Sequence, residues 1–410
     1  MNPSQPSSLS AFLADLPKPS PQALAVSDAL CRLITQEIRA NNEWISFARF
    51  MELALYAPGL GYYSAGSQKL GAAGDFTTAP ELSPLFAACL ARQLAQLFAQ
   101  GLQRILELGA GSGRLACDLL VHLAKLNALP EHYFILELSA ELQQRQRHLL
   151  EQEVPHLLPR IHWLSTLPEE FEGVIFANEL LDATPTHRVR ITPEGVEEIG
   201  VTTLAAHVAH VAGAPLTDEV TTSFCLAYRP ASEPLLFAAQ ALSLDLGFEA
   251  EINLNTRALI SCLTQRLSRG VMLLIDYGFG AAEFYHPQRH LGTLMCHYRH
   301  HAHDNPLVLL GLQDITAHVD FTAVTEAAIK SGAHLLGYTT QAHFLINCGI
   351  TQLLSDSNPQ EVQRYAPLAA QANQLLSPAE MGELFKVIAF GKHCAFPLLG
   401  FARGDKSHAL

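Results

Sequence analysis

The chain of 410 residues is longer than one compact domain usually is, so we expect a main core with added segments. Its composition, with 49% hydrophobic and 16% charged residues, is typical of a globular protein and excludes a largely disordered chain. The 39 acidic and 26 basic side chains give a formal net charge of -13, which argues against nucleic acid as a partner.

The N-terminal part of the chain changes character twice. Residues 1–21, rich in Ser and Pro, predict a flexible leader, and residues 22–100 predict an N-terminal helical lid region. Within that region, the Gly-, Pro- and Tyr-rich stretch from 56 to 84 indicates an ordered loop over a site. We find no basic signal region and no apolar run of about 18 residues. These features predict a cytoplasmic protein without membrane insertion.

From residue 101 the sequence alternates short apolar runs with amphipathic helices. This rhythm predicts an α/β fold with a parallel sheet, whose first part spans 101–185. Residues 186–265 break the rhythm and predict an inserted substrate lobe at the substrate side of the cleft. We expect the remainder of the core at 266–395 and a C-terminal tail at 396–410.

The strongest local signal is a glycine-rich turn at residues 109–113, here called the glycine loop. It follows an apolar strand and precedes a helix, so small residues and free N–H groups meet there, as in nucleotide sites. The spacing alone admits NAD, FAD or S-adenosylmethionine. Arg114 occupies the position at which a dinucleotide fingerprint has Gly or Ala, and Glu107 suits a cationic sulfonium ligand better than a pyrophosphate. These two residues favour S-adenosylmethionine.

Polar side chains follow two further predicted strands. Glu137 ends the strand after the glycine loop and can accept hydrogen bonds from ribose hydroxyls, the alternative being a solvent-exposed glutamate. Asn178, Glu179 and Asp182 gather where the strand at 173–177 ends, and α/β sheets bind ligands at such ends. They can bind a cation or accept a proton, and the alternative is a capped helix that begins at Asn178.

Eight short motifs occur in one order between residues 45 and 392. They are Tyr56–Tyr63, Gly74–Thr78, Glu107–Gly113, Phe176–Ala183, Leu274–Phe279, Gly292–Leu294, Gly311–Phe321 and Met381–Lys386. In this combination the chain resembles the MidA-type family of class I S-adenosylmethionine-dependent methyltransferases. The resemblance implies a Rossmann-like sheet and S-adenosyl-L-methionine as cofactor. It also implies a protein arginine as methyl acceptor, since mitochondrial members of the family modify a respiratory complex I subunit during assembly.

The resemblance also implies roles for individual residues. Those that would contact the cofactor are Gly74, Asp75, Thr77, Glu107, Gly109, Gly111, Gly113, Glu137 and Asn178. Those that would face the reaction centre are Glu179, Asp182 and Asn178. Carboxylates can fork onto the N–H groups of a guanidinium, and Glu179 is the first choice for this role and Asp182 the second.

Other interpretations stay open. The acceptor could be a small metabolite, or the chain could be a non-catalytic assembly factor that binds the cofactor. The run Cys296–His303 contains zinc-type ligands but has no partner pair at structural-zinc spacing, so we predict a loop and no metal. His300 or His318 could accept a proton, although a structural role is more common for a lone histidine.

Overall fold

The computed structural model describes residues 16–65, 77–206, 224–358 and 360–410, and it divides into two compact units. Unit 1 comprises Met1–Phe76, Pro185–Ile252 and Leu294–Thr316. Unit 2 comprises Thr77–Thr184, Asn253–Thr293 and Ala317–Leu410. Each unit is therefore assembled from segments that are far apart in the sequence.

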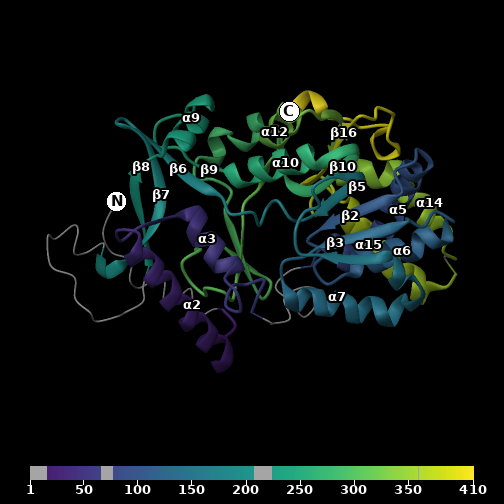
Figure 1. Cartoon of the computed structure of the whole chain (residues 1–410), viewed down its shortest axis with the longest axis horizontal. Coiled ribbons are helices and arrows are strands. Elements are labelled where there is room, and N and C mark those ends of the chain that lie inside the picture. The colour runs from purple at the N-terminus through teal and green to yellow at the C-terminus, as the bar shows by residue number, and fades with distance from the viewer. Residues whose placement is uncertain (1–15, 66–76, 207–223, 359) are drawn as a thin grey trace. The chain divides into compact units, whose positions relative to one another are not determined.

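Unit 2 contains the largest sheet (Figure 1). Its strands are β2 (Arg104–Leu108), β3 (His132–Leu136), β4 (Ile161–Leu164), β5 (Phe171–Asn178), β10 (Leu267–Phe279), β14 (Val319–Asp320), β15 (His334–Thr340) and β16 (Phe385–Lys392). They follow the order β15-β16-β10-β5-β2-β3-β4, and β14 pairs with the end of β10. Strands β10, β5, β2, β3 and β4 are parallel, whereas β16 is antiparallel to both neighbours. The predicted α/β class with a parallel-dominated sheet is confirmed.

The order of the strands predicts where a ligand site lies. After β2 the chain adds β3 and β4 on one side, whereas β5 and β10 lie on the other side of β2. Such a switch point leaves a crevice beyond the carboxyl ends of the two strands where the direction changes. Leu108 and Ala177 pair near the ends of β2 and β5, so the segments that follow these strands emerge next to each other.

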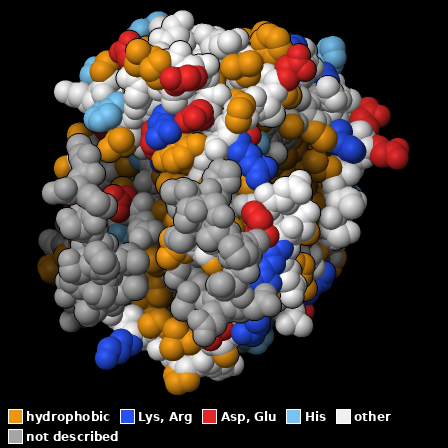
Figure 2. All heavy atoms as spheres, turned by 90° about the vertical axis from the view of Figure 1, so that its left-hand side faces the viewer, with side chains coloured by type: hydrophobic (Ala, Val, Ile, Leu, Met, Phe, Trp, Pro, Cys, Tyr) orange, Lys and Arg blue, Asp and Glu red, His pale blue; other side chains and the backbone are white. Residues whose placement is uncertain are grey.

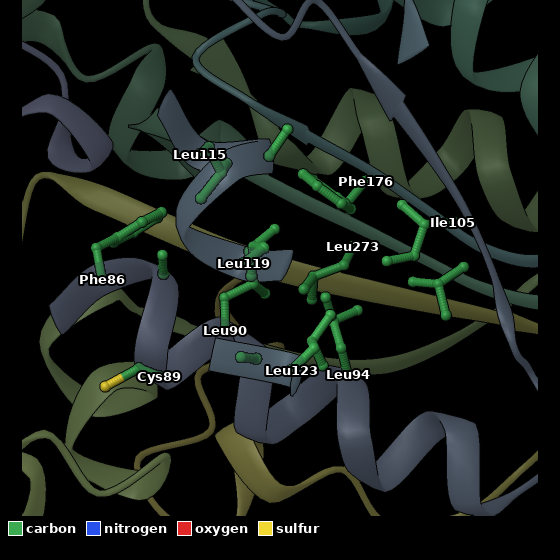
Figure 3. Packing of buried hydrophobic residues seen from close by; sticks show 14 of the residues in the cluster. Phe86, Cys89, Leu90, Leu94, Ile105, Leu115, Leu119, Leu123, Phe176 and Leu273 are labelled. Carbon is green, nitrogen blue, oxygen red and sulfur yellow. The ribbon is translucent and has the colours of Figure 1, made fainter. Parts of the chain in front are cut away.

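Helices cover both faces of this sheet. Successive strand residues point to opposite faces, and both faces carry apolar side chains that the helices bury. The helices of unit 2 are α4 (Ala79–Leu82), α5 (Pro84–Ala99), α6 (Arg114–Lys125), α7 (Ala140–Glu153), α10 (Leu254–Arg266), α11 (Ala281–Phe284), α12 (Phe321–Lys330), α13 (Gln341–Asn347), α14 (Ile350–Ser355) and α15 (Val362–Leu376), with short 3-10 turns at Pro155–Arg160, Pro287–Arg289, Leu399–Phe401 and Ser407–Ala409. Figure 3 shows Leu94 of α5 and Leu123 of α6 beside Leu273 of β10, on the face that also buries Ile105. The next residue of β2, Leu106, belongs to the core on the opposite face with residues of α10 and α12.

Unit 1 is built around a smaller antiparallel sheet. Its strands are β1 (Ile45–Ser46), β6 (His187–Thr192), β7 (Gly195–Thr203), β8 (Phe224–Pro230) and β9 (Glu249–Ile252), and its helices are α2 (Pro21–Ala40), α3 (Phe47–Tyr56) and α9 (Glu233–Ala241). A second sheet combines β11 (Met295–Tyr298), β12 (His301–His303) and β13 (Asp314–Thr316).

Two of the sequence motifs meet inside unit 1. The hydroxyl of Tyr63 donates to the carboxylate of Asp314, with 3.0 Å to each oxygen. Gly311 has a φ of 73°, and a Cβ there would lie 2.5 Å from the backbone oxygen of Leu60. Only glycine fits this close approach, so Gly311 is needed for the packing of the two motifs against each other.

The units differ from the predicted segments at several points. Residues 77–100, which include α5, belong with the large sheet and not with the N-terminal helices. The insertion ends at Ile252, so α10 lies in unit 2, and a further segment, Leu294–Thr316, joins unit 1. The expected tail packs on the core through Phe401, which is 9% exposed.

The surface carries charges of both signs. In Figure 2, Lys and Arg side chains are scattered among acidic and apolar ones, without a continuous basic patch among the residues coloured by type. Within the described ranges, no helix is both long and apolar enough to cross a membrane.

Candidate active site

The glycine loop follows β2 and leads into α6. Gly109 has a φ of 66° and Gly113 a φ of 85°, a region that side chains other than glycine rarely adopt. A Cβ on Gly109 would lie 2.8 Å from Leu180 Cδ1, and one on Gly113 would lie 3.1 Å from Gln146 Cα. Gly113 begins α6 without a side-chain cap, so N–H groups of the first turn face the loop. The close approaches and the positive φ values thus require glycine at Gly109 and Gly113.

Glu107, the acid at the end of β2, is only 2% exposed. It lies on the sheet face that α5 and α6 cover, and one oxygen accepts a hydrogen bond of 2.8 Å from Tyr133. Burial raises the pKa of Glu107 to about 8, although the Tyr133 hydroxyl opposes this effect. Glu107 therefore carries a proton at neutral pH until a cation lies beside it, and its contact with the cofactor stays a prediction.

Glu137 follows β3 and is held by a hydrogen-bond network. Its Oε1 accepts from the Ser139 N–H at 3.0 Å, and its Oε2 accepts from Gln146 Nε2 at 3.1 Å. The same Nε2 donates to the carbonyl of Gly111 at 2.9 Å, and Gln146 Oε1 accepts from Trp163 Nε1 at 3.0 Å. Glu137 is buried, not solvent-exposed as in the alternative considered above. Gln146, which the sequence did not single out, thus joins Glu137 to the glycine loop.

Residues 178–182 follow β5 and are here called the acceptor loop. No helix begins at Asn178, so the capped-helix alternative is wrong. Glu179 has a φ of 50°, and its Oε1 accepts from Asn178 Nδ2 at 3.1 Å. Two further oxygens of the loop, Asn178 Oδ1 and Asp182 Oδ1, are buried and have no hydrogen-bond partner of standard geometry among the residues described. Buried acceptors without well-aligned donors are costly, and a ligand bound at this loop could supply the donors.

A buried carboxylate from the neighbouring strand holds the acceptor loop. Asp276 Oδ2 accepts from the N–H groups of Leu180, Leu181 and Asp182 at 3.1, 2.8 and 3.3 Å. Asp276 Oδ1 accepts from the N–H of Tyr277 at 2.9 Å. Sequence reasoning did not assign Asp276 a role, although it lies within one of the eight motifs.

Helix α4 connects both loops. The hydroxyl of Ser112, in the glycine loop, donates to Glu81. The N–H of Ala79 lies 3.4 Å from Glu179 Oε1 in the acceptor loop. Of the predicted cofactor residues N-terminal to this helix, Thr77 is exposed, whereas Gly74 and Asp75 lie outside the described residues. The candidate site of unit 2 therefore consists of the glycine loop, Glu137, the acceptor loop and α4.

The two candidate histidines lie in different units. His300 is exposed in the turn between β11 and β12, with a φ of 64°. His318 stacks on Phe279 with 5.3 Å between ring centroids, and burial lowers its pKa to about 4. A histidine with this pKa is a weak proton acceptor at neutral pH. In the described ranges no three His, Cys, Asp or Glu side chains converge as in a metal site.

These residues fit S-adenosylmethionine in their chemistry. The sulfonium and ammonium of that molecule are cationic, and the unpartnered atoms of the acceptor loop are acceptors. Its ribose hydroxyls match a carboxylate such as Glu137, and the loop between them has no side chain at Gly109, Gly111 or Gly113.

Comparison with known proteins agrees with this geometry. Residues 89–339 match the model of a family described as putative S-adenosyl-L-methionine-dependent methyltransferase. A protein from Burkholderia thailandensis, described as a likely methyl transferase bound to S-adenosyl-homocysteine, is 47% identical with a TM-score of 0.90. That comparison covers 97% of this chain and 100% of the other.

Curated relatives carry a more specific name. The protein arginine methyltransferase NDUFAF7 of Danio rerio is 28% identical over 90% of this chain and 88% of its own length. The human protein of that name is also 28% identical, over 85% of this chain and 80% of its own. Both are named as mitochondrial. This finding overturns the prediction of a cytoplasmic protein. That prediction rested on the absence of a recognisable targeting signal, which does not determine where a protein is located.

Proposed function

The chain belongs to the S-adenosyl-L-methionine-dependent methyltransferase family, and from this premise we propose that it methylates a nitrogen of a protein arginine. The family match confirms the predicted enzyme class, cofactor and resemblance. The arginine acceptor is supported by the names of the curated relatives and by the acceptor loop of this chain.

The acceptor loop is the observation that carries the proposal. It presents Glu179 and two buried oxygens without donors, Asn178 Oδ1 and Asp182 Oδ1. A guanidinium has five N–H donors in one plane and keeps its charge at all ordinary pH values. Such a group satisfies several acceptors at once, which a neutral hydroxyl acceptor cannot do. A carboxylate-rich loop also reduces the repulsion between a cationic acceptor and a cationic methyl donor.

In the proposed reaction the bound cofactor supplies the methyl group. The chain holds the two reactants in line and excludes water from them. Glu179 would bind the guanidinium, since its carboxylate is oriented by Asn178 and by the Ala79 N–H. Asp182 lies on the same loop, and its Oδ1 has no hydrogen-bond donor of standard geometry among the residues described. Thr77, Glu107, Glu137 and the glycine loop would bind the cofactor.

The acceptor can be identified directly. The purified protein is incubated with a cell extract and isotopically labelled S-adenosylmethionine, and mass spectrometry locates the label. We expect label on arginine side chains of one or a few proteins, and a respiratory complex I-type subunit is the first protein to examine. Label that appears only in small molecules would refute the arginine assignment and favour a metabolite methyltransferase. Cofactor binding without any transfer would favour a non-catalytic assembly factor.

A further inference from the structure

Asp182 has an unusual environment for a carboxylate. It is 7% exposed, and its Oδ2 accepts a hydrogen bond of 2.7 Å from the hydroxyl of Tyr277 on β10. Its backbone oxygen accepts from the N–H of Ala317 at 3.0 Å, which fixes the end of the acceptor loop. Oδ1 has no hydrogen bond of standard geometry in the described part of the chain, and the backbone N–H groups of Asp182 and Ala183 near the carboxyl lower its pKa. The side chain is thus held by one oxygen while the other is available to a donor.

Asp276 lies against this carboxylate and keeps the loop in place. It accepts from three consecutive N–H groups of the loop, including that of Asp182 itself. Two buried carboxylates close together repel each other when both are charged, so one of them readily takes a proton. Burial and the charges of Asp182 and Glu179 raise the pKa of Asp276 well above its ordinary value, so Asp276 takes the proton and Asp182 is the ionised member of the pair.

We propose that Asp182 Oδ1 accepts the proton that the acceptor nitrogen loses during methyl transfer. Tyr277 and Asp276 are positioning residues: Tyr277 binds the Asp182 carboxylate, and Asp276 holds the backbone of the loop. This inference rests on the proposed nitrogen acceptor. The nitrogen forms a bond to the methyl carbon, and the carbon–sulfur bond breaks with its electron pair remaining on sulfur. The N–H proton passes to Asp182 Oδ1, and Oδ2 keeps its hydrogen bond to Tyr277. The proton then leaves to water when the products depart.

The basicity of Asp182 fits this role. Burial raises its pKa to about 6, and the Tyr277 hydroxyl acts in the opposite direction. An aspartate with this pKa is ionised at neutral pH and is a better base than an ordinary aspartate. Three titratable groups lie near Asp182: Asp276 and Tyr277 of β10, and Glu179 of its own loop. A fourth, His318, packs its ring edge-on against Tyr277 with 5.1 Å between ring centroids. His318 stays neutral above about pH 5, because burial lowers its pKa to about 4.

The test compares pH profiles of methyl transfer in three variants of the full-length protein. Asp182→Asn should lower kcat about 100-fold or more while S-adenosylmethionine still binds. Tyr277→Phe removes a hydrogen bond to the charged carboxylate, so the acidic limb of the profile should move up by about one pH unit. Asp276→Asn exchanges a protonated carboxyl for a neutral amide, so the limb should stay where it is in the wild type. A shift in Tyr277→Phe without a shift in its neighbour Asp276→Asn is not expected from a general loss of structure.

A readout without turnover keeps the inference independent of the acceptor. Carboxyl NMR of the protein alone should show the pKa of Asp182 raised in Tyr277→Phe. The matched control is Tyr285→Phe, which also removes a tyrosine–aspartate hydrogen bond, of 3.2 Å to Asp320, and should leave the Asp182 pKa unchanged. Arginine methylation by the wild type with an acidic limb that Tyr277→Phe does not move would overturn this inference. Absence of label on arginine in every variant, with the NMR shift present, would instead overturn the proposed function.

Discussion

Replacing Gln146 by Met tests whether this residue joins the two halves of the cofactor site. Gln146 is fully buried, and Met keeps its length while removing three hydrogen bonds, to Gly111, Glu137 and Trp163. Two of these bonds hold Gly111 and Glu137, which are predicted to contact the cofactor, and a hydrogen bond contributes about 0.5–1.5 kcal/mol. Their loss amounts to about 1–3 kcal/mol, which corresponds to a cofactor Kd weaker by about 5- to 150-fold.

Isothermal titration of the folded variant with S-adenosylmethionine measures this change. Gln143→Met is the matched control, because Gln143 lies one turn earlier on α7 and donates at 2.7 Å to the backbone oxygen of Glu137, without contact to the glycine loop. We expect the control to bind within about threefold of the wild type, since it leaves the Glu137 carboxylate in place. Wild-type affinity in Gln146→Met, or equal losses in both variants, would refute the reasoning.

Three further predictions concern the same site. Glu179→Gln should reduce arginine methylation at least tenfold, while the cofactor affinity measured by titration stays unchanged. The control is Glu326→Gln at an exposed position, and turnover of Glu179→Gln equal to that of the wild type would show that Glu179 does not bind the guanidinium. Gly113→Ala should weaken cofactor binding, because the new Cβ meets the backbone of Gln146 at 3.1 Å and the φ of 85° is unfavourable; unchanged binding would contradict this. Glu107→Gln should stabilise the ligand-free protein as pH rises. The raised pKa of Glu107 costs the wild type stability between its ordinary value of 4.5 and about 8, by about 1 kcal/mol per pH unit, so chemical denaturation at pH 5 and pH 8.5 should show a difference that grows with pH.

Much of the large sheet could be predicted from local patterns. Apolar runs mark β2, β3, β4 and β5 because these strands are short and nearly buried, and the helices between them have regular apolar spacing. β15 was not identified, since its sequence, His334–Thr340, contains a glycine and has no clear alternation. The run Cys296–His303, predicted as a loop, instead forms most of the hairpin of β11 and β12, so that prediction was wrong. The turn of this hairpin has Arg299 and His300 at positive φ, where glycine or asparagine usually marks a hairpin.

The candidate site was only partly predictable because its supports are distant in sequence. Glu107, Glu137 and the acceptor loop follow strands, and strand ends are visible in a sequence. Gln146 and Asp276 act through contacts that exist only after folding, and Gln146 lies within an ordinary helical pattern. The same limit applies to unit 1, since Tyr63 and Asp314 are joined by a hydrogen bond across most of the chain.

The acceptor loop shows why local preference is a poor guide to such a site. Left-handed backbone at a residue other than glycine costs about 1–2 kcal/mol, so Glu179 would not adopt its φ of 50° unaided. The N–H of Glu179 donates to Ile275 at 2.9 Å, and Asp276 binds the next three N–H groups of the loop. β10 therefore supplies the energy that keeps the carboxylate of Glu179 where a cation can reach it. It follows that substitutions at Asp276 that remove its acceptor oxygens should lower activity, although this residue is buried beneath the loop.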